Sequence, residues 1–140
     1  MCLWGVRVTA ADGLVTMQSS YGPVETMNRL RAEVEATGMT VFADIDHAAG
    51  AKGVELPLLP TDLLIFGNAK GGTRLMQSVQ TIGIDLPLKA LVWQDASGNT
   101  WVSYNDPNWV AKRHGLRNKT EAPISAIAAV LDAVAKAATQ

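Results

Sequence analysis

The chain has 140 residues, which is room for one domain and for little else. Hydrophobic residues make up 48% of it and charged residues only 18%, so a disordered chain is excluded. The net charge of −1 excludes sequence-independent binding to nucleic acid, and no stretch reaches the ~20 apolar residues of a membrane span. Because the single cysteine, Cys2, cannot form an internal disulfide and no signal peptide is recognisable, we expect a soluble, cytoplasmic single domain over residues 1–140.

The first half of the chain contains two strand patterns, one buried apolar run and one helix pattern. Residues 4–17 alternate apolar and polar side chains around an Asp-Gly turn, which predicts a hairpin. Residues 23–37 carry one apolar stripe at helical spacing, and Gly38 suits the left-handed residue that follows a helix. Residues 40–46 alternate again, and residues 63–66 form a short apolar run typical of a strand buried on both faces.

The second half contains one further hairpin and three helix patterns. Apolar spacing predicts a short helix over 73–82, a helical turn over 108–114 and a C-terminal helix over about 123–138. Residues 88–94 and 100–104, separated by a turn sequence, predict paired strands. Since hairpins supply most of the connections, the sequence predicts an α+β domain with two layers, in which helices cover one face of a mainly antiparallel sheet.

The first candidate site is Asp44-Ile45-Asp46-His47, at the end of a predicted strand. Carboxylates beside an imidazole share a proton or bind a metal, so His47 is the candidate general acid or base, with Asp46 or Asp44 setting its tautomer. The alternative is that His47 is a hydrogen-bonded loop residue without a chemical role.

The second candidate site is the segment Gly67–Thr73, between a buried strand and a predicted helix. Its glycines allow a ligand to approach the backbone, and Lys70 with unpaired N–H groups at a helix start favours an anion. The segment lacks the residue order of a phosphate-binding P-loop. The structural alternative is a plain turn in which Thr73 caps the helix.

The third candidate segment is Tyr104–Trp109, followed by His114. Asx residues beside a proline form a turn, and a histidine near a helix C-terminus caps carbonyl groups. Two histidines are too few for a histidine-rich zinc site, and a mixed metal site of His47, His114 and an aspartate requires distant segments to meet. The sequence contains no G-x-S-x-G nucleophile motif, and no cofactor is predicted.

Four long motifs resemble the family catalogued as domain of unknown function 302, in matching order over about residues 15–116. They are DHAAGA (Asp46–Ala51), PTDLLIFGNAKGGTRLMQ (Pro60–Gln77), DLPLKALVWQD (Asp85–Asp95) and WVSYNDPNWVAKRHGL (Trp101–Leu116). The resemblance implies a small bacterial or archaeal α+β domain, usually a homodimer, with no settled activity. The polar positions that it suggests as a site are Asp46, His47, Asn68, Lys70, Thr73, Lys89, Tyr104, Asn105 and His114.

Three functions remain open at this point. The leading hypothesis is that a small anionic ligand binds between the Gly71-Gly72-Thr73 turn and His47, with Lys70 supplying charge and with further contacts from Asn68, Lys89, Tyr104 and Asn105. The second is an enzyme or metal-binding protein that uses His47. The third is a structural or interaction module that acts as a homodimer, because apolar strands leave a second sheet face that one helical layer does not cover.

Overall fold

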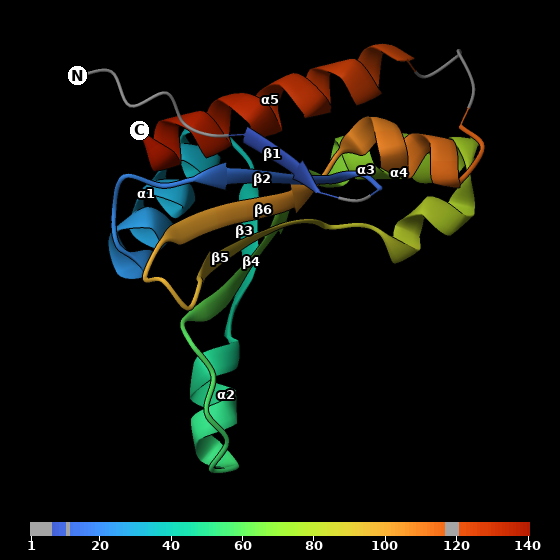
Figure 1. Ribbon diagram of the computed structural model, residues 1–140. Helices are drawn as coiled ribbons and strands as arrows, with labels where there is room; N and C mark the ends of the chain where they lie inside the picture. Colours follow the sequence, from blue (N-terminus) through green and yellow to red (C-terminus); the bar gives the residue numbers. More distant parts are fainter. Residues whose placement is uncertain (1–6, 11, 117–120) are drawn as a thin grey trace.

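The computed structural model describes residues 7–10, 12–116 and 121–140, which form a six-stranded antiparallel sheet with helices (Figure 1). Every pair of neighbouring strands is antiparallel, which confirms the predicted α+β class. In spatial order the strands are β1 (Arg7–Ala10), β2 (Leu14–Gln18), β6 (Thr100–Asn105), β5 (Leu88–Gln94), β4 (Thr61–Gly67) and β3 (Thr40–Asp46).

The main core lies between one face of the sheet and two helices, α1 and α5 (Figure 1). Their apolar stripes pack on alternate strand residues, which burial of apolar surface stabilises. The helices are α1 (Pro23–Ala36), α2 (His47–Gly53), α3 (Ala69–Ser78), the 3-10 helix η1 (Gln80–Ile84), α4 (Pro107–Arg113) and α5 (Glu121–Thr139). The side chains buried completely in this core are Val34, Leu64, Phe66, Val102 and Ala138.

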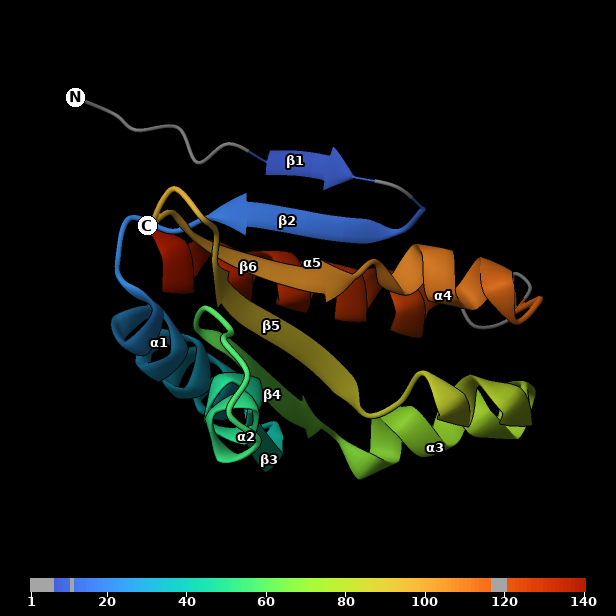
Figure 2. The same cartoon turned by 60° about the horizontal axis from the view of Figure 1, so that its bottom comes forward.

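The opposite face of the sheet carries a second set of apolar side chains. Figure 2 looks onto this face, with α5 behind the sheet. The rings of Trp93 and Trp101 stack there, with centroids 6.1 Å apart. Strand alternation places Leu63, Ile65 and Leu91 on the same face, where they are half-buried. We call this surface the open face.

The hairpins and the first helix lie where the sequence predicts them. β1 pairs with β2 across a turn at Gly13, whose φ of +81° requires glycine, and β5 pairs with β6. Residues 4–6 of the predicted first strand lie outside the described residues. Helix α1 ends before Gly38, which has the left-handed φ of +85°.

One predicted helix has the wrong limits. In place of a helix over 73–82, α3 begins at Ala69 and η1 follows it. The cause is Asn68, whose side-chain oxygen accepts the N–H groups of Lys70 (2.9 Å) and Gly71 (3.3 Å) and so starts the helix early. Thr73 is therefore a residue of the helix interior and not its cap.

An unpredicted arm, residues 47–60, projects from the ends of β3 and β4, away from α5 (Figure 1). It consists of α2 and an extended return segment. The side chain of Asp46 accepts the N–H of Ala49 (2.9 Å) and caps α2. The arm leaves four apolar side chains in water: Val54 (67% exposed), Leu56 (64%), Leu58 (50%) and Leu59 (47%).

Candidate functional site

A cavity of about 310 Å³ lies where β4 ends and β5 begins, beside α3. We call it the strand-end cavity. Its walls come from four separate segments, so only the folded sheet assembles it. The apolar lining residues are Met39, Phe42, Leu75, Met76, Leu86, Pro87, Leu88 and Ile127, and the segment around the start of α3 supplies Gly67, Asn68, Ala69, Gly71, Gly72 and Thr73.

The early start of α3 shapes the wall of this cavity. A Cβ atom placed on Gly72 would lie 3.8 Å from the Leu86 Cδ1 atom, so any larger side chain there has to enter the cavity. The first N–H groups of the helix are already paired, two with the Asn68 side chain and that of Gly72 with the Asn68 carbonyl (2.9 Å). The sequence analysis expected unpaired N–H groups at this helix start to bind an anion. The N–H groups of Lys70, Gly71 and Gly72 are instead already hydrogen-bonded within the chain.

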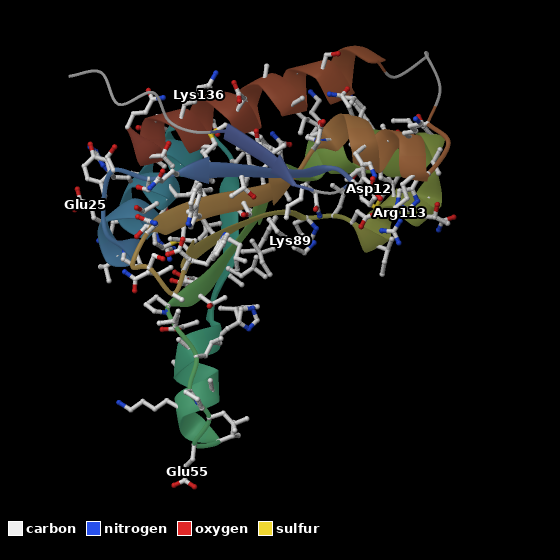
Figure 3. The ribbon with its side chains drawn as sticks, in the orientation of Figure 1. Asp12, Glu25, Glu55, Lys89, Arg113 and Lys136 are labelled. Atoms are coloured by element: carbon white, nitrogen blue, oxygen red, sulfur yellow. The ribbon has the colours of Figure 1, made fainter. Side chains whose placement is uncertain are left out.

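Two lysines lie near the strand-end cavity. The ammonium group of Lys89 donates to the carbonyl of Pro87 (2.9 Å), which is a lining residue. Lys70 is exposed in the first turn of α3. In the described part of the chain, neither lysine forms an ion pair with a carboxylate. Figure 3 shows Lys89 close to the sheet, far from Glu55 at the tip of the arm.

A smaller cavity of about 30 Å³ adjoins the strand-end cavity and shares Leu75, Leu86, Leu88 and Ile127 with it. Lys89, Asn105 and Asp85 also line this space. The structure thus brings Asn68, Lys89 and Asn105 to the same end of the sheet, as the sequence hypothesis required. Tyr104 is 5% exposed and packs in the main core. It does not line either cavity.

His114 forms the centre of a partly buried polar cluster that joins η1 to α4. Its Nε2 atom lies 2.5 Å from a carboxylate oxygen of Asp85, and its Nδ1 atom lies 3.0 Å from the Thr81 hydroxyl. Arg113 donates to both oxygens of Asp85 (2.9 and 3.0 Å). His114 ends α4, as predicted. Its partner Asp85 was not predicted, because the two residues are 29 positions apart in the sequence.

His47 lies far from this site, and a joint site of His47 and Lys70 is wrong. His47 begins α2 beyond the end of β3, whereas Lys70 follows the opposite end of the sheet. The seven residues of β4 separate the two ends by about 20 Å at ~3.3 Å per residue. A small ligand cannot contact both residues. The carboxylate of Asp46 accepts a hydrogen bond from the N–H of Ala49 and caps α2.

The two histidines are separated in the same way, since His114 lies beside α4 and His47 is on the arm (Figure 1). Among the described residues, no group of three or more histidine, cysteine, aspartate or glutamate side chains is arranged to hold a metal. The mixed metal site that the sequence left open is therefore not formed by His47 and His114.

An interacting carboxylate pair, Asp44 and Asp62, was missed by the sequence analysis. Strand register places Asp44 beside Leu64 and Asp62 opposite Asp46, at the arm end of the sheet. Burial raises the pKa of Asp62 to about 7, with further increases from the hydrogen bond and charge of Asp44 and the charge of Asp46. Arg31, which binds Asp44, opposes this change in the pKa. The pair forms only in this register of β3 with β4. In the sequence, the only indication of it is the position of Asp62 beside an apolar run.

Known proteins are similar in sequence to most of this chain. It is 48% identical over 116 residues to "Fluoride-specific ion channel FluC 1" of Brucella suis biovar 1 (strain 1330), a match that covers 83% of this chain and 46% of that protein. "Fluoride-specific ion channel FluC 2" of Brucella melitensis biotype 1 is also 48% identical over 116 residues, with 43% of it covered. The chain therefore spans less than half the length of these relatives. No helix in the described residues is long and apolar enough to cross a membrane.

The fold also matches a solved structure. The crystal structure of an uncharacterized conserved protein DUF302 from Bacillus stearothermophilus superposes with a TM-score of 0.82 at 21% identity and covers 93% of this chain and 100% of that chain. The family model described as "Domain of unknown function DUF302" matches residues 15–134. The fold, the order of the motifs and this match agree, and the chain belongs to the family of domain of unknown function DUF302.

Proposed function

We propose that this domain binds a small molecule in the strand-end cavity. The observation that carries the proposal is the cavity itself, whose ~310 Å³ lies at the lower end of the range of about 300–1,000 Å³ that ligand sites occupy. Asn68, Gly71, Gly72 and Thr73, which the sequence marks as ligand-binding residues, all line it. His47 is not part of this proposal.

Filling the cavity tests the proposal. In Gly72→Leu the new side chain enters the cavity, because Gly72 faces Leu86 at van der Waals distance. We expect the fluorescent probe 1-anilinonaphthalene-8-sulfonate to bind the parent protein at least tenfold more tightly than this variant, measured by fluorescence titration. Gly50→Leu is the matched control, since a Cβ there meets nothing within 4 Å and the position lies on the arm. Equal affinity of the parent and a folded Gly72→Leu variant for the probe would contradict the proposal.

A second candidate function, homodimerisation, is favoured by the open face and the arm. Leu56 and Leu58 are at least half exposed, and Trp93 and Trp101 present a stacked aromatic pair on the open face. Tryptophan is enriched among the residues that contribute most to binding at interfaces. We infer that a second copy covers these surfaces about a two-fold axis, with about 1,200–2,000 Å² removed from water in total.

We expect the parent chain to sediment at twice the chain mass at micromolar concentration. The double variant Leu56→Ser/Leu58→Ser should shift the species to the monomer, because it removes apolar area from the interface. Val24→Ser, which changes a side chain that is 76% exposed on α1, serves as the control and should remain dimeric. A parent protein that sediments as a monomer, unchanged by tenfold concentration, would exclude the dimer.

The curated relatives suggest a biological setting. We propose that this domain acts together with a fluoride channel, because the relatives that it matches over 116 residues are named as fluoride channels and are more than twice as long as the matched part. Fluoride itself does not suit the strand-end cavity, since a small hydrated anion loses its hydration in an apolar lining and the nearby helix N–H groups are already paired.

Fluoride tolerance tests this setting. We expect cells that lack this domain to stop growing at lower sodium fluoride concentrations than the parent strain, with equal growth in sodium chloride. Purified protein should show the same melting temperature in both salts. Equal fluoride tolerance of the deletion and parent strains would exclude the setting, and a melting temperature raised only by fluoride would show that the domain binds the ion directly.

A further inference from the structure

We infer that the ligand of the strand-end cavity is an amphipathic anion, with an apolar body inside the cavity and one acidic head group at its rim. This inference rests on the proposed binding function and names the chemical class of the ligand. Two independent properties of the described residues support it, the lining of the cavity and the distribution of charge around it.

The lining selects an apolar body. Nine of the side chains around the cavity are apolar, and only Asn68 and Thr73 offer polar side-chain atoms. The side-chain oxygen of Asn68 already accepts two backbone N–H groups. A polar or ionic group placed inside would lose its hydration without gaining partners, which excludes an inorganic anion as the whole ligand.

The charges around the rim select an acidic head group. Lys89 uses one of its three ammonium protons on the Pro87 carbonyl and keeps two donors for a ligand. Lys70 adds a second positive charge in the first turn of α3. Asp85 lines the smaller cavity together with Lys89, but its carboxylate is already paired with Arg113 and His114. Asp44 and Asp62 lie at the opposite end of the sheet. The rim therefore attracts an anion and repels a cation.

Three ligands with the same ten-carbon chain separate the two contributions. Binding of decanoate, 1-decanol and decyltrimethylammonium is measured by isothermal titration calorimetry at pH 7.5, below micelle-forming concentrations. We expect decanoate to bind at least tenfold more tightly than 1-decanol, and the cation to bind most weakly. Lys89→Gln should reduce the affinity for decanoate about fivefold or more and leave that for 1-decanol unchanged. Lys52→Gln, which removes an exposed lysine on the arm, is the control and should match the parent protein.

The outcomes distinguish the ligand class from the proposed function. If 1-decanol and decanoate bind equally, and both are blocked by Gly72→Leu, the cavity binds ligands but the inferred acidic head group is wrong. Displacement of decanoate by millimolar phosphate, with Gly72→Leu binding decanoate normally, would overturn the inference by placing the anion outside the cavity. If none of the three ligands binds the parent protein, the proposed function and the inference both fail.

Discussion

Asp62→Asn is expected to stabilise the protein at and above pH 7 and to have almost no effect on stability near pH 4. In the folded protein the pKa of Asp62 is raised to about 7 from an ordinary value of 3.8, first by burial and then by Asp44. The stabilising contribution of the protonated carboxyl is complete below the unfolded pKa and is lost as the pH rises through the folded pKa. Asparagine remains neutral and donates a hydrogen bond to Asp44 at every pH.

The advantage of the variant should therefore grow between about pH 4 and pH 7 and then stay level, at about 1–2 kcal/mol for a carboxyl that is partly in contact with water. Urea denaturation at several pH values measures it. Glu35→Gln is the control, because Glu35 is an exposed carboxylate of α1, and its stability difference from the parent should not follow this profile. Parallel pH profiles for the parent and Asp62→Asn would show that Asp62 is ionised normally in the folded protein.

Asp85→Asn is expected to cost about 2–3 kcal/mol of unfolding free energy at pH 7. Asp85 accepts hydrogen bonds from Arg113 and lies 2.5 Å from the His114 ring, and its side chain is only 12% exposed. An amide has one acceptor oxygen in place of two and carries no charge, so the buried His114 ring and the guanidinium lose their common partner. The loss separates η1 from α4 and should also loosen the small cavity that Asp85 lines.

The matched variant is Arg113→Gln, which removes the exposed partner from the same carboxylate. The Arg113 side chain is 50% exposed, and ion pairs at this exposure contribute about 0–1 kcal/mol. Urea unfolding of the two variants should therefore rank Asp85→Asn well below Arg113→Gln in stability. A loss of the same size in both would mean that the ion pair with Arg113, and not the contact with His114, is the important interaction.

The sequence by itself determined the elements whose signals are local. Helix α1 has its apolar stripe and Gly38 within one short stretch, and both hairpins have their turn residues between two predicted strands. The same local patterns were enough to predict the fold class, because a short connection can join antiparallel strands but is too short to join parallel ones. The residues around Asn68 were likewise recognisable as a candidate binding segment, since glycine and lysine at the end of a strand are a local signal.

Only the tertiary structure decided which segments meet. The sheet order placed Lys89 and Asn105 at the end of the sheet near α3 and left His47 at the other, a result of strand pairing between residues far apart in the sequence. Helix α3 begins at Ala69 despite two glycines, which are poor helix formers, because Asn68 caps it and Leu75 is buried. Short α2 has no apolar stripe of its own, and the Asp44–Asp62 pair exists only in the register of β3 with β4. Local periodicity cannot encode such contacts, because the free energy that selects them comes from packing between distant residues.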